Sequence, residues 1–325
     1  MKLRVLGSSN IGVSEIGYGC MGLTWAYGDS MAEHRERDAV ELLNEAVDLG
    51  VTLFDTADMY GPFNNEELLG KALSSRRPEI VVATKCGLVV HGDRANYDMR
   101  RSGTPDHIRR ACDASLRRLR TDAIDLYQLH RVDPNVPVEE SVGAMSELVD
   151  AGKVRAIGLS EVDVETLERA MAVYPIASLQ SEYSLFERNV ELEILPWCEA
   201  NGVAFLAYSP LGRGMLTGRL AQADIKAGDF RATLPRFQDE AFDANRRIVE
   251  RIERVAAGLG ATSGQVALAW LLAKSPNVIP IPGTKRLQYL NENVGAAAVA
   301  LSPEDIAELD ALPGPMGNRY PEAKT

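Results

Sequence analysis

The sequence predicts an α/β fold, a closed (β/α)8 barrel of the TIM type with a short N-terminal β-hairpin. Three observations lead to this prediction. Short β-branched runs alternate with longer segments of helical periodicity, eight such runs are present, and no low-complexity linker interrupts the series. Strands that alternate with helices form parallel sheets, and eight of them favour a closed barrel over an open doubly wound sheet. We therefore expect residues 1–325 to form a single domain.

The expected strands are short and apolar. They cover residues 16–19, 51–54, 80–84, 124–129, 154–158, 177–180, 203–207 and 278–281. Before them, residues 4–6 and 11–13 form the expected hairpin. Apolar residues at helical spacing predict barrel helices over 39–49 and 108–119, and Gly50 ends the first of these stripes.

Two long segments, 91–104 and 209–239, show no periodicity and follow the third and seventh expected barrel strands. We expect both to be irregular loops. Long loops inside compact domains are usually functional, so these two are candidates for binding segments.

Composition narrows the class of protein. The chain is 46% hydrophobic and 25% charged, as in globular proteins with a sizeable core. Its net charge of −11 argues against a nucleic-acid or anionic-membrane surface, because both need clustered basic residues. The four cysteines lie far apart and indicate reduced thiols, and no signal peptide or membrane-spanning run is apparent. We expect a cytoplasmic protein with a small-molecule partner, and the oligomeric state stays open.

Chemically active residues stand where the expected strands end. These residues are Asp55, Lys85, His130, Ser160, Gln180, Glu182, Tyr208 and Ser209. Each of them alone is compatible with a structural role. In a barrel of this type the C-terminal strand ends meet at one rim, where active sites lie. Their convergence therefore predicts a catalytic site.

Asp55, Tyr60, Lys85 and His130 together suit a phenol that donates a proton. A tyrosine has a reference pKa near 10, and a neighbouring ammonium lowers the pKa by favouring the phenolate. We expect Lys85 to supply that charge and Asp55 to hold Lys85 by a charge-assisted hydrogen bond. His130 can orient a carbonyl oxygen. The set suits carbonyl reduction if a hydride donor lies alongside.

With these residues in view, the chain resembles the aldo-keto reductases, NADPH-dependent carbonyl reductases built on a (β/α)8 barrel. The motifs that carry the resemblance occupy residues 19–22, 54–61, 83–85, 128–131, 158–160, 208–214 and 281–285. Segments 99–105 and 180–185 are most similar to the branch that contains perakine reductase. The resemblance implies that Asp55, Tyr60, Lys85 and His130 form the catalytic tetrad, with Tyr60 as general acid.

The resemblance also implies an NADPH site. The nicotinamide half is assigned to Gly22, Asp55, Ser160 and Gln180, with Tyr208 stacking on the ring. The pyrophosphate is assigned to the segment that contains Ser209, Leu211, Gly212 and Gly214. The adenosine phosphate is assigned to Gly283, Thr284, Lys285, Arg286, Gln288, Glu292 and Asn293. For substrate, Trp25, Tyr60 and His130 are expected to bind a carbonyl compound. Trp25, Tyr27, Met59 and the loop that contains Tyr97 are expected to shape the pocket, which implies an apolar or aromatic carbonyl compound; core packing is the alternative role for each of these side chains.

A separate prediction comes from Thr284, Lys285 and Arg286, and it does not depend on the resemblance. These residues follow the last expected strand and precede an expected helix start. A 2′-phosphate needs donors and cations, and a helix N-terminus adds favourable potential. This group therefore predicts a preference for NADPH over NADH.

Two positions depart from the family pattern. Glu161 follows Ser160 where many members have asparagine, and Tyr289 stands where better-known members have an arginine near the adenine. Neither position touches the tetrad. The role of Glu161 is open.

One motif is misleading. Residues 17–22 read GxGxxG, but the residues that follow lack helical periodicity, so we expect a strand-to-loop turn rather than a Rossmann site. Metal catalysis is not expected either. The histidines, His34, His91, His107 and His130, show neither HxH nor HExxH spacing.

Two other functions remain open. Lys85 could form a Schiff base, as in lysine-dependent barrel aldolases, and borohydride trapping without nicotinamide would detect it. The chain could also be a non-catalytic nucleotide-binding regulatory subunit, because fold alone does not fix function. Absence of carbonyl-dependent NADPH oxidation would favour that reading.

Overall fold

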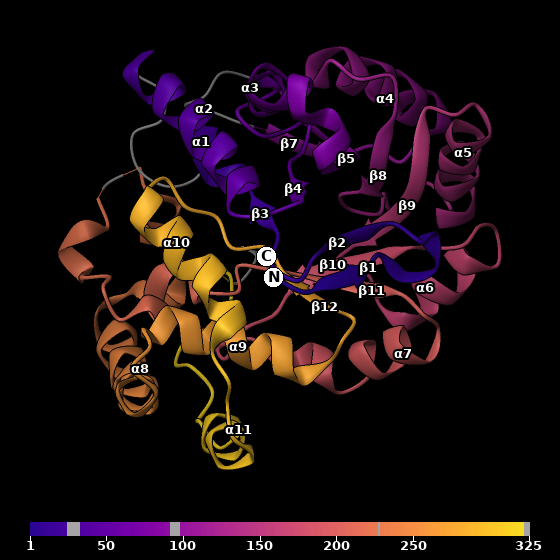
Figure 1. Ribbon diagram of the computed structural model, residues 1–325. Helices are drawn as coiled ribbons and strands as arrows, with labels where there is room; N and C mark the ends of the chain where they lie inside the picture. The colour runs from indigo at the N-terminus through magenta and orange to yellow at the C-terminus, as the bar shows by residue number, and fades with distance from the viewer. Residues whose placement is uncertain (25–32, 92–97, 227, 322–325) are drawn as a thin grey trace.

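The computed structural model describes residues 1–24, 33–91, 98–226 and 228–321. Its centre is a parallel sheet of eight strands in the order β3, β4, β5, β8, β9, β10, β11 and β12 (Figure 1). These strands are β3 Tyr18–Gly19, β4 Leu53–Asp55, β5 Val81–Cys86, β8 Ile124–Leu129, β9 Val154–Ser160, β10 Ser178–Glu182, β11 Ala204–Tyr208 and β12 Val278–Pro280. The predicted (β/α)8 barrel is confirmed.

Backbone hydrogen bonds join the first and last strands of the sheet. The amide of Gly17 donates to the carbonyl of Pro280 at 2.9 Å, and Gly19 donates to Pro282 at 3.1 Å. A Cβ atom on Gly283 would lie 2.6 Å from the carbonyl oxygen of Gly19. The backbone segments at Gly19 and Gly283 can therefore approach this closely only because glycine has no side chain.

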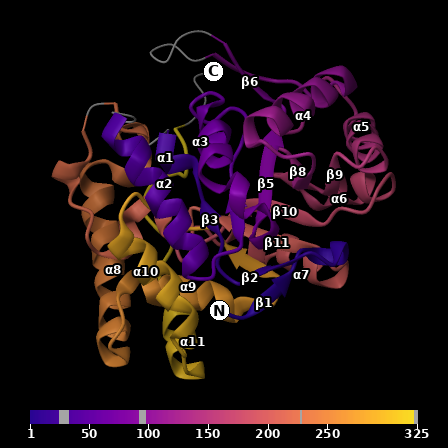
Figure 2. The ribbon, with the colours of Figure 1, turned by 45° about the horizontal axis from the view of Figure 1, so that its top comes forward.

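Helices surround the sheet (Figures 1 and 2). They are α1 Met21–Thr24, α2 Glu33–Asp48, α3 Asn64–Leu73, α4 Pro105–Leu119, α5 Val138–Asp150, α6 Val164–Met171, α7 Ile194–Ala200, α8 Asp239–Leu259, α9 Ser263–Lys274, α10 Leu287–Gly295 and α11 Pro303–Asp310. The two apolar stripes fall on α2 and α4. Gly50 follows α2 with φ of +85°, a left-handed conformation that suits glycine at a helix end.

None of the helices in the described ranges is by itself long and apolar enough to cross a membrane. Within the same described ranges, α8 and α9 reach that length and hydropathy when taken together, and they are bent by 88° at their junction.

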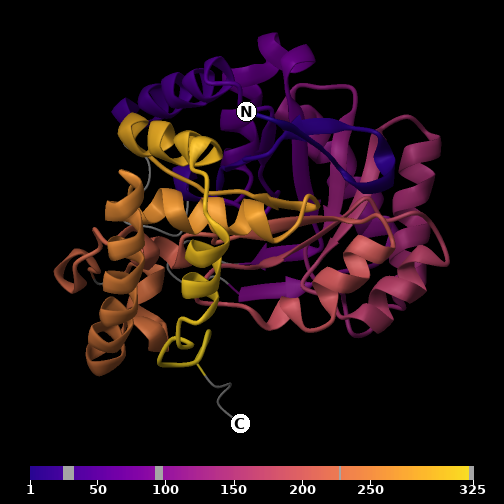
Figure 3. The same cartoon turned by 60° about the horizontal axis from the view of Figure 1, so that its bottom comes forward.

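The N-terminal hairpin lies across one end of the barrel (Figure 3). β1 Leu3–Val5 pairs antiparallel with β2 Gly12–Ser14, as expected. Leu6, Ile11 and Val13 of the hairpin pack against barrel residues that include Leu53 and Val81, near the amino ends of their strands. The hairpin thus fills that end with apolar side chains, and the carboxyl ends of the strands remain for the site.

Two loop predictions are corrected by the structure. β6 Leu88–His91 pairs antiparallel with β7 Asp98–Arg101, so the segment 91–104 is not wholly irregular. All of β7 is exposed, and a strand with no buried face has no apolar alternation to detect. The glycine-rich segment 17–22 leads into α1, a single helical turn, rather than into a loop. The segment 209–239 is irregular as expected, with short 3-10 turns such as η4 Gly212–Thr217.

Candidate active site

The four candidate catalytic residues come from three neighbouring strands. Asp55 ends β4, Lys85 lies near the end of β5, and His130 directly follows β8, while Tyr60 lies in the turn after β4. These strands are adjacent and parallel in the sheet. Their carboxyl ends therefore bring the four side chains to one edge, as the sequence predicts.

Lys85 lies at the centre of this group. Its Nζ atom donates to Oδ1 of Asp55 at 2.6 Å and to the carbonyl oxygen of Thr56 at 2.8 Å, and it lies 3.5 Å from the hydroxyl oxygen of Tyr60. The Lys85 side chain is fully buried, and the Asp55 side chain is 4% exposed. A buried ammonium of this kind needs charged and polar partners, and Asp55 and Thr56 supply them.

Burial sets the proton affinity of the phenol. Burial raises the pKa of Tyr60 above its ordinary value. The nearby Lys85 lowers the pKa, but its effect is smaller than that of burial. The expectation of a lowered phenol pKa is therefore wrong for the protein in this state, because desolvation outweighs the ammonium. For Lys85 itself, burial lowers the pKa, but Asp55 and Tyr60 together raise it above its ordinary value. At neutral pH both groups keep their protons.

His130 lies beside the phenol as a neutral ring. Its ring meets that of Tyr60 edge-on, with centroids 5.8 Å apart at 84°. Burial, and then the charges of Lys85 and Arg131, lower the pKa of His130 well below its ordinary value. Its Nδ1 atom is buried and has no hydrogen-bond partner within the described chain. A neutral imidazole here can donate one N–H to a carbonyl oxygen without adding charge.

Two polar residues assigned to the nicotinamide half adjoin the tetrad. Gln180 donates from Nε2 to Oδ2 of Asp55 at 2.8 Å, so it shares the carboxylate with Lys85. Arg131 donates to Oγ of Ser160 at 3.1 Å. Both Ser160 and Gln180 are buried. Arg131 was not assigned to the site from the sequence, although it lies within one of the motifs.

The loop after β11 has unusual backbone conformations. Gly212 and Gly214 have φ of +56° and +98°, which glycine adopts without strain. Ser209 and Arg213 have φ of +48° and +56°, which is uncommon for residues with side chains. Non-glycine residues persist there where the surrounding structure holds them, often at functional sites.

Basic and aromatic side chains gather around the start of α10. Arg286 lies over the ring of Tyr289 at 5.6 Å, and Arg219 lies over the same ring at 5.2 Å. Arg219 also donates to Oε1 of Glu292 at 2.9 Å, and Gln288 donates to the same oxygen at 3.3 Å. Arg219 belongs to the loop after β11 and was missed from the sequence, because its partner Glu292 lies 73 positions further along the chain.

Of the residues expected to contact or shape the substrate pocket, Met59 and Tyr60 lie in a buried apolar cluster. Ala57 belongs to the same cluster, and Leu88 and Val90 of β6 pack against it. The predictions for Trp25, Tyr27 and Tyr97 lie outside the described residues.

Comparison with known proteins identifies the family. Residues 15–313 match the Aldo/keto reductase family. A "Probable aldo-keto reductase 1" of Glycine max is 44% identical over 319 residues, which span 97% of this chain and 90% of that protein. The chain belongs to the aldo-keto reductase family. This aldo-keto reductase is therefore an oxidoreductase of small-molecule carbonyl compounds.

Solved structures agree with this assignment. A glycerol dehydrogenase from Gluconobacter oxydans has a TM-score of 0.86 and 32% identity, with 95% of this chain and 94% of that chain covered. An aldo/keto reductase from Klebsiella pneumoniae, solved with NADP and acetate, has a TM-score of 0.72 and 30% identity, with 98% and 99% covered. The aldo-keto reductase described here shares their fold over nearly its whole length.

Proposed function

We propose that this aldo-keto reductase reduces an aldehyde or ketone to an alcohol with a proton from Tyr60. One observation carries the assignment of Tyr60: the buried Nζ of Lys85 lies 2.6 Å from Asp55 and 3.5 Å from the phenol oxygen. When bound, NADPH supplies the hydride, in keeping with the family.

Each residue of the tetrad has a separate role in this proposal. Tyr60 holds a proton at its hydroxyl and donates it to the carbonyl oxygen. Lys85 remains an ammonium and stabilises the phenolate that donation leaves. Asp55 keeps Lys85 in place, and His130 orients the carbonyl oxygen as a neutral donor.

The residues around the strand ends fit a dinucleotide. Gly214 leaves its backbone uncovered by a side chain of its own, which permits close approach. Cations stand at the start of α10, where a helix N-terminus favours a phosphate. We infer that Thr284, Lys285 and Arg286 hold the 2′-phosphate, with Arg219 as a further cation.

The other functions are less well supported. A Schiff base at Lys85 requires the neutral amine, but the raised pKa of Lys85 keeps it as an ammonium. A regulatory subunit has no need of the Lys85 network described above. We also propose a single domain over residues 1–325, located in the cytoplasm and without a nucleic-acid or membrane partner, which the net charge of −11 supports.

A carbonyl panel with NADPH and with NADH tests this function in the wild type and in Tyr60→Phe. Positioned proton transfer contributes about 10²- to 10⁴-fold, so Tyr60→Phe should lose that factor in kcat. The Kd for NADPH should stay the same. Near-wild-type turnover in Tyr60→Phe would remove Tyr60 as the acid, and borohydride trapping without nicotinamide would indicate the aldolase instead.

A further inference from the structure

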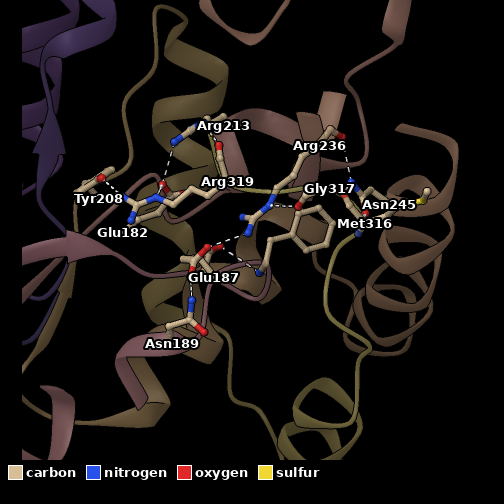
Figure 4. Close-up of polar contacts among 12 residues, drawn as sticks. Glu182, Glu187, Asn189, Tyr208, Arg213, Arg236, Asn245, Met316, Gly317 and Arg319 are labelled. Carbon is tan, nitrogen blue, oxygen red and sulfur yellow. Dashed lines mark hydrogen bonds and ion pairs between the residues drawn. The ribbon is translucent and has the colours of Figure 1, made fainter. Parts of the chain in front are cut away.

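A charged cluster outside the tetrad surrounds Tyr208, and the C-terminal segment enters it (Figure 4). Nε of Arg319 donates to Oε2 of Glu182 at 2.6 Å. The two terminal nitrogens of Arg319 donate to the two carboxylate oxygens of Glu161 at 3.0 and 2.9 Å. Arg319 also contacts the hydroxyl of Tyr208. One guanidinium thus joins the carboxyl ends of β9, β10 and β11.

The segment that carries Arg319 is held firmly against the rest of the protein. Asn245 of α8 is fully buried, accepts from the amide of Met316 at 2.7 Å and donates to its carbonyl at 3.1 Å. Arg236 donates to the carbonyl of Gly317 at 3.3 Å. Gly317 has φ of +91°, and a Cβ there would lie 3.0 Å from the backbone nitrogen of Arg236, so the contact requires glycine. Figure 3 shows the C-terminal segment, in yellow, near α8.

Glu161 links this cluster to the proposed nicotinamide half of the site. It follows Ser160, and its amide donates to the carbonyl of Gln180 at 3.0 Å. Its φ is +54°, in the left-handed region that is uncommon for a side chain of this kind. Its carboxylate accepts from Arg319 and from the amide of Glu182 at 3.0 Å. These bonds hold Glu161 in a conformation that it adopts rarely.

Charge also ties the cluster to the pyrophosphate loop. Arg213 donates to Oε2 of Glu182 at 2.9 Å, the same oxygen that accepts from Arg319. The side chain of Glu182 is 3% exposed and that of Glu161 is 19% exposed. Two carboxylates beside an anion-binding loop would repel a dinucleotide unless cations neutralise them. Arg319 bonds to both carboxylates.

We propose that Arg319 is a positioning residue for the nicotinamide half of the cofactor site and acts through Glu161 and Tyr208. The proposal rests on the proposed function, which places NADPH at these strand ends. Arg319 neutralises Glu161, holds its strained backbone, and fixes the hydroxyl of the Tyr208 ring.

Binding measurements without turnover test this role. We would determine Kd by nicotinamide or protein fluorescence for NADPH, for NADH and for adenosine 2′,5′-bisphosphate, which lacks the nicotinamide half. Arg319→Met should weaken both dinucleotides by the same factor, about tenfold or more, because charge-assisted bonds are lost. Binding of adenosine 2′,5′-bisphosphate should change less than about twofold. The dinucleotide Kd values of Arg319→Lys should lie between those of the wild type and Arg319→Met, since lysine keeps the charge but lacks the bidentate fork of arginine.

A matched control separates positioning from simple anchoring of the segment. Arg236→Met removes another arginine that bonds the segment, and Arg236 bonds Glu187 and Gly317 rather than Glu161 or Tyr208. We expect no selective loss of dinucleotide binding in this variant. Glu161→Gln in the Arg319→Met background should recover part of the lost affinity, because it removes the uncompensated carboxylate.

Several outcomes would overturn the proposal. One is unchanged dinucleotide affinity in Arg319→Met, and another is an equal loss of affinity for adenosine 2′,5′-bisphosphate in that variant. The same selective loss of dinucleotide affinity in Arg236→Met would also overturn it, as would a double variant, Arg319→Met with Glu161→Gln, that binds more weakly than Arg319→Met alone. Tighter binding in Arg319→Met would also overturn it, by showing that Arg319 obstructs the subsite. These results do not depend on proton transfer, so full turnover in Tyr60→Phe would refute the role of Tyr60 and leave this test intact. Failure of the wild type to bind NADPH would refute the proposed function itself.

Discussion

Lys85 lies 3.5 Å from the hydroxyl of Tyr60, and both side chains are buried. This relationship makes the ammonium the main influence that opposes desolvation of the phenol. Burial raises the pKa of Tyr60 and Lys85 lowers it, so the net value depends on whether the lysine is present.

Replacing Lys85 with methionine should reduce kcat for carbonyl reduction by about 10²-fold or more, because the phenolate left by proton donation loses its counter-charge. The pKa of Tyr60 should also rise, since burial and the charge of Asp55 then raise it with only the weaker effect of Arg131 against them. Reduction requires the protonated phenol, so the alkaline limb of the kcat/KM profile should move to higher pH. For alcohol oxidation, which needs the phenolate, the acidic limb should move the same way.

Lys71→Met is the matched control for that variant. Lys71 is an exposed lysine near the C-terminal end of α3 and pairs with Glu36 at 2.5 Å. Unshifted pH limbs in Lys85→Met, or the same shift in Lys71→Met, would contradict the electrostatic role.

The cations at the start of α10 should decide cofactor preference. We expect wild-type Kd for NADPH to be at least tenfold lower than for NADH, because charge-assisted hydrogen bonds contribute about 1.5 to 3 kcal/mol each. Lys285→Ala with Arg286→Ala should remove most of this difference by weakening NADPH alone. Titration of both cofactors measures it, with Arg109→Ala as control, because Arg109 is a partly exposed arginine that pairs with Glu147. An undiminished preference in the double variant would place phosphate recognition elsewhere.

The loop of residues 209–239 should become less dynamic when NADPH binds. Its residue Arg219 already contacts Tyr289 and Glu292, which belong to α10, and its glycines allow the backbone to approach a pyrophosphate. Amide hydrogen exchange at saturating NADPH should therefore slow in this loop and not in α5, on another part of the barrel. Equal exchange with and without NADPH would exclude a clamp. Arg219→Ala should reduce the slowing if that contact secures the loop.

Asp58 should make the stability of the protein pH-dependent. Burial, and then the nearby Glu66, raise the pKa of Asp58 to about 8, and its Oδ1 atom has no hydrogen-bond partner among the described residues. Because the folded-state pKa lies above the unfolded one, the contribution to stability is complete below about pH 4 and is lost as pH rises to about 8. The loss is at most about 1.4 kcal/mol per pH unit in that window.

Asp58→Asn should therefore flatten the pH dependence of the free energy of unfolding. Urea denaturation at pH 5 and pH 8 measures the effect, and the variant should gain stability relative to wild type at pH 8. Asp106→Asn, at an exposed position on α4, should leave the slope as it is. Parallel curves for wild type and Asp58→Asn would show that Asp58 is already ionised in the folded protein.

The sequence by itself determined the barrel and the proposed tetrad. Most barrel strands are short, largely apolar runs between helical segments, and the tetrad residues stand near or shortly beyond strand ends. Such patterns depend only on residues that are close in the sequence. Parallel strands of a barrel then place their carboxyl ends at the same rim. The hairpin, α2 and α4 were predictable for the same reason.

Tertiary structure alone decided three other features. The net pKa of Tyr60 depends on burial, which is a property of packing from several segments rather than of Lys85 alone. The exposed strand β7 exists because it pairs with β6, and it has no apolar pattern of its own. Arg319 reaches Glu161 across 158 positions, and no local signal marks a contact of that span. The physical reason is common to all three: desolvation, strand pairing and long-range ion pairs are set by residues that become neighbours only when the chain folds.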